Sequence, residues 1–90
     1  MTRNVLLYLS DILENMRRSQ EFIGNQTYEE FSADAKTVYA VLRCLEVIGE
    51  AAKNVPLSVR EQYPVVPWKD MAGMRDRLIH FYFGISYGKA

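Results

Sequence analysis

Apolar residues recur every three or four positions in three long stretches of this chain, which is the spacing of an amphipathic helix. The first stretch runs from Asn4 to about Ile23 and has charged residues on its other side. Its apolar positions are Val5, Leu9, Ile12, Leu13, Met16 and Ile23. Gly24 and Asn25 tolerate the positive φ found at helix ends, so the pattern predicts a helix that stops there.

The second long stretch ends at Lys53 and has the most regular helical pattern in the chain. Its repeated apolar and small positions are Ala35, Val38, Leu42, Leu45, Gly49 and Ala52. Thr27 followed by Glu30 is the pattern of a capping box, which predicts a short helical turn, and either Thr27 or Ser32 is expected to start the long helix. A glycine inside a helix costs about 1 kcal/mol relative to alanine, so Gly49 indicates a close helix crossing.

Three prolines divide the rest of the chain. Asn54 is expected to end the second long helix, and Pro56 suits the first turn of a short helix that runs from Leu57 to Tyr63. The stretch 64–67 predicts an extended connection, after which the helical pattern returns from Trp68 to about residue 83. No segment alternates with a period of two, so the sequence predicts an all-α, small antiparallel helical bundle.

The composition limits the function classes open to this bundle. Ninety residues with 49% hydrophobic and 24% charged residues fit one small globular core, and 11 basic against 11 acidic residues exclude a polycation that coats nucleic acid. One cysteine and one histidine exclude an internal disulfide and the familiar zinc sites. No apolar run approaches the roughly 20 residues of a membrane span, so we expect a cytoplasmic protein with no membrane contact.

The densest chemistry lies in the stretch 68–82, which holds the only tryptophan and the only histidine of the chain. Asp76 and His80 are four residues apart, so on a helix the carboxylate can orient the imidazole and raise its basicity. Arg75 and His80 diverge by roughly 140° and reach one substrate only across a groove or with help from a second copy. Without further support, the residues alone favour a half-buried surface histidine beside a solvated, locally paired Arg-Asp-Arg face over a catalytic site.

Three segments carry a family resemblance. Arg75-Asp76-Arg77-Leu78-Ile79-His80 is similar to the signature of HEPN-domain ribonucleases, an arginine followed after four to six residues by a histidine. His80-Phe81-Tyr82 extends this first segment, which then resembles the His-x-Tyr form of HepT-like toxins. The segments 45–53 and 67–71 resemble the two other recurrent segments of that family, and all of them occur in the family's order.

The resemblance implies a homodimeric, metal-independent endoribonuclease that needs no cofactor and cleaves tRNA or mRNA. It implies the toxin of a type VII-like toxin–antitoxin system, silenced by an MNT-type nucleotidyltransferase antitoxin. His80 would act as general acid and base, Arg75 as phosphate clamp and Asp76 as orienter, and Tyr82 would receive AMP from the antitoxin. The alternatives are a non-catalytic RNA- or nucleotide-binding partner subunit of the nucleotidyltransferase, and a purely structural helical dimer.

Several other residues have both a functional and a structural interpretation. Arg77 and Lys69 are candidate RNA contacts, and further phosphate contacts are open to Arg17, Arg18, Arg43 and Lys53. Glu46 and Glu50 fit a solvated or dimer-contacting pair better than a metal site, and Trp68 fits a core anchor better than a base-stacking platform. Cys44 is expected to be a small core residue, and Tyr82 without the resemblance would be one more packing aromatic.

The expected domain covers residues 1–90 as a single HepT-like unit. Members of the family usually continue past the His-x-Tyr segment with a further helix, whereas this sequence stops at Ala90. The expected domain therefore lacks that C-terminal helix.

Overall fold

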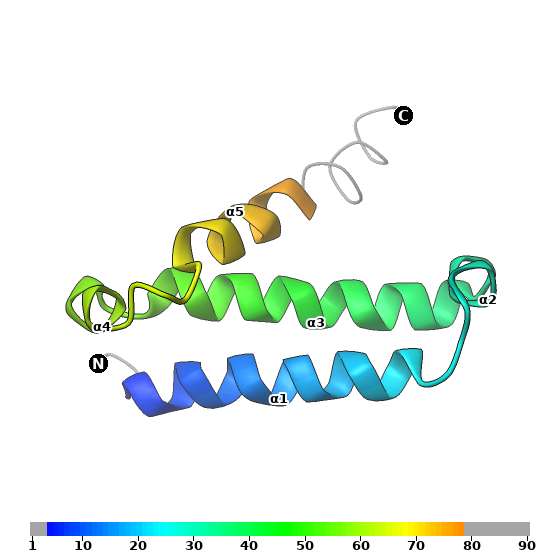
Figure 1. Cartoon of the computed structure of the whole chain (residues 1–90), viewed down its shortest axis with the longest axis horizontal. Helices are drawn as coiled ribbons and strands as arrows, with labels where there is room; N and C mark the ends of the chain where they lie inside the picture. The colour runs from blue at the N-terminus through cyan, green and yellow to red at the C-terminus, as the bar shows by residue number, and fades with distance from the viewer. Residues whose placement is uncertain (1–3, 79–90) are drawn as a thin grey trace.

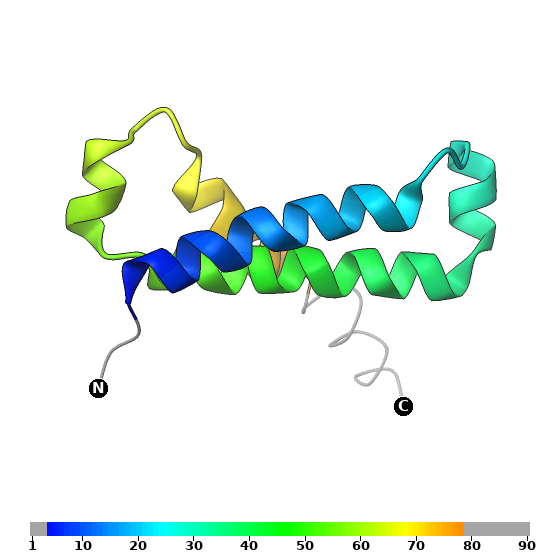
Figure 2. The same cartoon turned by 90° about the horizontal axis from the view of Figure 1, so that it is seen from below.

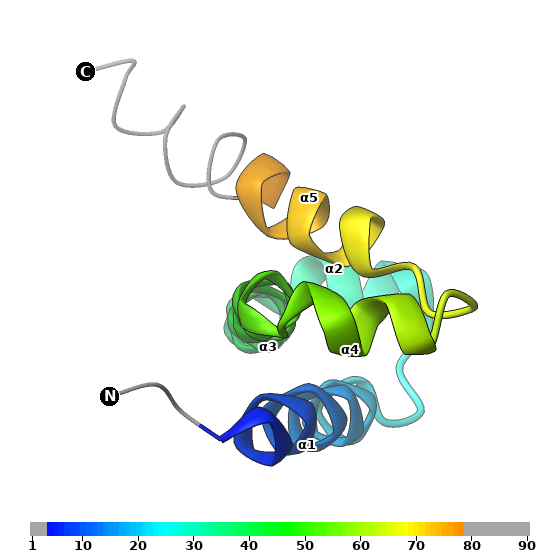
Figure 3. The ribbon, with the colours of Figure 1, turned by 90° about the vertical axis from the view of Figure 1, so that its left-hand side faces the viewer.

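The computed structural model describes residues 4–78, and within this range the chain is helical with no strand. Its elements are α1 (Val5–Ile23), α2 (Tyr28–Ala33), α3 (Ala35–Asn54), α4 (Leu57–Gln62) and α5 (Trp68–Leu78). Figure 1 shows α1 and α3 side by side and antiparallel, while the end-on view in Figure 3 places α5 on the opposite side of α3 from α1. The predicted all-α antiparallel bundle is confirmed, with α3 as its middle helix.

The turn between α1 and α2 forms as the sequence predicts. Gly24 has φ 55°, a conformation that glycine adopts without strain, and its amide donates to the carbonyl of Gln20 at 3.0 Å. The Thr27 hydroxyl accepts from the Glu30 amide at 3.1 Å, and the Glu30 carboxylate accepts from the Thr27 amide at 2.8 Å. This reciprocal capping box fixes the start of α2 and turns the chain back towards α3, as Figure 2 shows.

The start of α3 differs from the prediction. Neither Thr27 nor Ser32 begins it, because Thr27 caps α2 and Ser32 lies inside α2. Asp34 is the N-cap instead: its carboxylate accepts from the Thr37 amide at 3.2 Å and from the Thr37 hydroxyl at 2.6 Å. These hydrogen bonds, with another from Gln26, hold the pKa of the Asp34 carboxyl below its ordinary value. Asp34 is only two residues from the predicted start at Ser32, and this segment contains several good N-cap residues.

The connection from α4 to α5 also differs from the prediction. It was expected to be extended, but the amide of Val66 donates to the carbonyl of Tyr63 at 3.1 Å, which closes a turn. Pro64 occupies the second position of this turn, where its fixed φ is favourable. The turn reverses the chain so that α5 comes back over α3, where Met71 and Arg75 lie against Gly49.

The core lies along α3. Its central cluster of buried residues is Ile12, Ile48, Ala51 and Ala52, and the partly buried Tyr8, Leu45, Trp68 and Met71 pack against it. On α1 only Ile12 is buried, and Leu13 and Met16, which were expected to share its buried face, are 67% and 43% exposed. The apolar face of α1 is wider than the single stripe that α3 covers, which explains this difference. None of the helices within residues 4–78 has the length and apolarity of a membrane span.

Candidate active site

Gly49 sets how closely α5 approaches α3. It is buried, and a Cβ atom built on it would lie 2.2 Å from the Cβ of Arg75 and 2.8 Å from the carbonyl oxygen of Met71. Only a residue without a side chain leaves room for α5 here. The predicted close helix crossing is therefore confirmed, and the residue packed directly against the glycine is Arg75.

Two carboxylates hold the guanidinium of Arg75. Its Nε lies 3.2 Å from the Glu50 Oε1 of α3, and its Nη1 donates to the Asp76 Oδ1 at 3.2 Å. The Nε atom is shielded from solvent, and its geometry towards Glu50 is that of an ion pair rather than of a hydrogen bond. The side chain is 28% exposed, so the arginine is anchored at its base and open to solvent on part of its surface.

Asp76 pairs with two cations. Besides Arg75, its Oδ1 lies 3.6 Å from the Nζ of Lys53 on α3. The hydrogen bond from Arg75, together with the charges of Lys53 and Arg75, holds the pKa of the Asp76 carboxyl below its ordinary value. Asp76 therefore remains a carboxylate in mildly acidic solution, as the orienting role expected of it requires.

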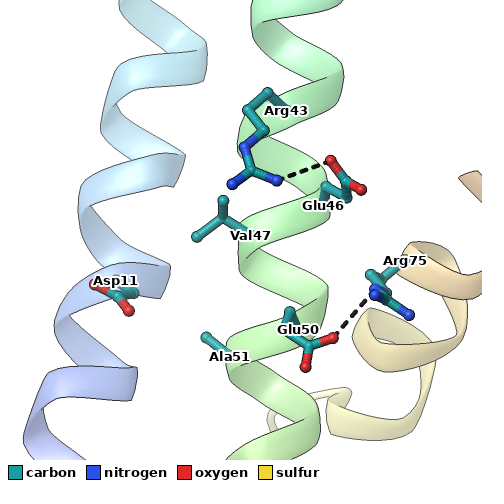
Figure 4. A pocket seen from close by; sticks show the side chains of 7 residues that line it. All are labelled: Asp11, Arg43, Glu46, Val47, Glu50, Ala51 and Arg75. Carbon is teal, nitrogen blue, oxygen red and sulfur yellow. Dashed lines mark hydrogen bonds and ion pairs between the residues drawn. The ribbon is translucent and has the colours of Figure 1, made fainter. Parts of the chain in front are cut away.

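A cleft of about 250 Å³ opens beside Arg75, along the side of α3. Its lining comes from three helices: Asp11, Arg43, Glu46, Val47, Glu50, Ala51 and Arg75. In Figure 4 the dashed lines mark the two ion pairs of this cleft, Arg43 with Glu46 and Arg75 with Glu50. The cleft thus presents two guanidinium groups, each with a carboxylate beside it, next to a small apolar floor.

The structure separates Lys69 and Arg77 from this cleft. Both are exposed on α5, but neither lines the cleft that Arg75 lines. Two residues along a helix correspond to a rotation of about 200°, so Arg77 projects from the side of α5 opposite to Arg75. Lys69 lines a different groove of about 430 Å³, beside Trp68 and Arg60.

Trp68 and Cys44 have the packing roles that the sequence favoured. Trp68 packs against the core, and its indole N–H donates to the carbonyl of Tyr63 at 3.1 Å. Cys44 is 3% exposed, and burial raises the pKa of its thiol, which keeps it an unreactive core residue. Within residues 4–78 no three potential ligands among His, Cys, Asp and Glu gather where they could hold a metal ion.

His80 and Tyr82 lie outside the described residues, as does the expected end of the third long helix at residues 83–84. Of the expected catalytic residues, the structure therefore describes Arg75 and Asp76. The contact of Asp76 with His80 and the role of Tyr82 stay predictions.

Comparison with known proteins assigns this architecture to a family. The profile of the family described as "Ribonuclease HepT-like" matches residues 12–90. The chain belongs to the HepT-like ribonuclease family. "Putative RNase MJ1216" of Methanocaldococcus jannaschii is 53% identical over 94% of this chain and 70% of its own length. "Probable ribonuclease HepT" of Thermococcus cleftensis is 47% identical over 96% of this chain and 78% of its own length. No solved structure matches the chain.

The membership confirms the resemblance inferred from the three sequence segments and supports the expected ribonuclease activity. One feature of this HepT-like site was not foreseen from the sequence, the contact of Glu50 and Lys53 with the Arg75-Asp76 pair. A signal for it was present: Gly49 marks the crossing point, and the charged residues one and four positions later then flank the crossing helix.

Proposed function

We propose that this HepT-like chain is a metal-independent endoribonuclease and the toxin of a toxin–antitoxin pair. The observation that carries the proposal is the placement of Arg75: it packs against Gly49, pairs with Glu50 and lines a polar cleft, in a chain of a ribonuclease family. A guanidinium in that position suits a phosphodiester, because its fork matches two phosphate oxygens.

The proposed chemistry uses the RNA itself as nucleophile. His80 takes the proton of a 2′-OH, whose oxygen attacks the adjacent phosphorus, and the bond to the 5′-oxygen of the next nucleotide breaks. Protonated His80, from the same copy of the chain or from a second one, gives a proton to the leaving oxygen. The products carry a 2′,3′-cyclic phosphate and a 5′-OH. Arg75 stabilises the charge on the phosphoryl oxygens, and Asp76 orients His80. Arg77 and Lys69 contribute contacts to more distant phosphates.

Two copies complete the proposed site. Arg75 and His80 are five positions apart and diverge by roughly 140° if the helix of α5 continues, so Arg75 of one copy faces His80 of the other across a two-fold groove. The exposed apolar residues of α1, among them Leu6 and Leu13, lie on a helix on the far side of α3 from α5. The proposed dimer instead joins the two copies at their Arg75 clefts, which α1, α3 and α5 line together.

Control by an MNT-type nucleotidyltransferase is part of the proposal. Transfer of AMP to Tyr82 would place a bulky anion near Arg75 and occupy the phosphate subsite. This modification would silence the nuclease without unfolding it.

The proposal is tested with purified protein, total tRNA and mRNA in EDTA, beside the variants Arg75→Ala and His80→Ala. We expect cleavage by the native protein only, with products that end in a 2′,3′-cyclic phosphate, while both variants keep native helicity. Tight RNA binding without cleavage would reject the enzyme and favour the non-catalytic partner subunit. Absence of both binding and cleavage would favour a structural dimer.

A further inference from the structure

Where α3 and α5 cross, two charged side chains of α3 each lie beside an opposite charge on α5. Glu50 faces Arg75 at 3.2 Å, and Lys53 faces Asp76 at 3.6 Å. On α3 the two charges are three positions apart and share a face, whereas on α5 they are adjacent in sequence. The pairing therefore depends on the close approach at Gly49, which brings the backbone of α5 within reach of both side chains.

Stability is a weak explanation for these pairs. The side chains of Glu50, Lys53 and Asp76 are 51%, 51% and 56% exposed, and ion pairs between groups that open to water contribute little to folding. Arg75 is different, because its Nε is shielded from solvent while the side chain has many rotamers to lose. The effect of Glu50 on Arg75 is chiefly to select one orientation of the guanidinium.

We propose that Glu50 is a positioning residue for Arg75, and that the phosphate of the RNA competes with its carboxylate for the guanidinium. This inference rests on the proposed function and names a further residue of that site. In the free protein the charges of Glu50 and Asp76 compensate Arg75 and Lys53. A phosphate oxygen must enter beside or in place of the Glu50 carboxylate, because carboxylate and phosphate use the same edges of an arginine.

The proposal predicts opposite effects of Glu50 on RNA binding and on turnover. Its negative charge repels the incoming phosphate, so it weakens RNA binding. Its contact with Nε keeps the guanidinium in place before the RNA arrives, so it raises the turnover number. A residue that only supports the fold would not produce this split.

The test compares Glu50→Gln, which removes the charge and keeps the shape, with Glu50→Asp, which keeps the charge and shortens the reach. Glu21→Gln is the matched control, because Glu21 is also an exposed carboxylate paired with an arginine, Arg17, and lies near the C-terminal end of α1. Kd is measured with a labelled mixed-sequence oligodeoxynucleotide, which lacks the 2′-OH and is not cleaved. kcat is measured on tRNA in EDTA.

For Glu50→Gln we expect Kd to fall threefold or more and kcat to fall tenfold or more. Glu50→Asp should lose kcat similarly without the gain in binding, and Glu21→Gln should stay within twofold of the native protein on both measures. Native values of both Kd and kcat in Glu50→Gln would overturn the proposal, and so would a gain in binding that Glu21→Gln reproduces in full.

A second measurement needs no RNA and separates this proposal from the proposed function. The Nε–Hε group of Arg75 is followed by nitrogen NMR, with Arg75→Lys used to assign the signal. We expect an ordered group in the native protein and in Glu21→Gln, and a mobile one in Glu50→Gln. If the native protein fails to cleave RNA, the proposed function fails, while this spectrum still decides whether Glu50 orders Arg75. An equally ordered Arg75 in Glu50→Gln would overturn the positioning role.

Discussion

Replacing Gly49 with alanine adds one methyl group at the contact between α3 and α5. The added carbon would lie 2.2 Å from the Cβ of Arg75, whereas ordinary van der Waals contact begins near 3.4 Å. It would also lie 2.8 Å from the carbonyl oxygen of Met71, which belongs to the backbone and cannot rotate away. To accept the methyl group, α5 must therefore move outward by about 1 Å.

The effect on stability is the difference of two opposing terms. Overpacking of a close contact costs about 1–3 kcal/mol, whereas alanine in place of glycine inside a helix gains about 1 kcal/mol. We expect Gly49→Ala to be destabilised by about 0–2 kcal/mol and to remain folded. The effect on cleavage is expected to be larger, because a displacement of about 1 Å at a positioned group can cost about 100-fold in rate.

The assay pairs urea unfolding, followed by circular dichroism, with RNA cleavage in EDTA. Gly73→Ala is the matched control, since a Cβ there meets only the mobile end of the Arg77 side chain at 3.2 Å. That control should gain up to about 1 kcal/mol of stability from its helix propensity. If Gly49→Ala gains the same stability and cleaves RNA at the native rate, the close crossing does not position Arg75.

Three further predictions concern the fold and its charges. Ile48→Ala, at a 4% exposed core position of α3, should lower the free energy of unfolding by about 2–5 kcal/mol in urea titrations. Thr27→Ala removes the hydroxyl of the capping box and should cost about 1 kcal/mol by the same assay, whereas Thr27→Ser should restore most of it. The pKa of Asp76 is lowered in the folded protein, so its contribution to stability is complete above its ordinary pKa and is lost as the pH falls through the folded value. Asp76→Asn should therefore lose less stability than the native protein between neutral pH and about pH 3.

Much of the fold could be predicted from the sequence because its signals are local. Gly24 and the capping box at Thr27 act within one turn of the chain, and helical periodicity marks the long elements. The predicted start of α3 was wrong because several good N-cap residues compete within a short segment. Only the hydrogen bonds of Asp34 with Gln26 and Thr37 select among them. The predicted burial of Leu13 and Met16 was wrong because periodicity identifies an apolar face but not how much of that face a partner helix covers.

The candidate site was predictable in part for a related reason. The motif identified Arg75 and Asp76, and Gly49 indicated that two helices cross closely. Which helices cross, and in which register, depends on the turn at Pro64 and on packing between distant segments. The contact of Glu50 with Arg75, two residues 25 positions apart, becomes visible only once that register is known.

The most direct test of the account mixes two inactive variants, Arg75→Ala and His80→Ala, after co-refolding at equal concentration. If Arg75 of one copy and His80 of the other form each site, a mixed dimer contains one intact site. The mixture should then recover roughly a quarter of the native cleavage rate, since about half of the dimers are mixed and each has one of two sites. If mixed dimers form but the mixture stays inactive, the site is not shared between two copies.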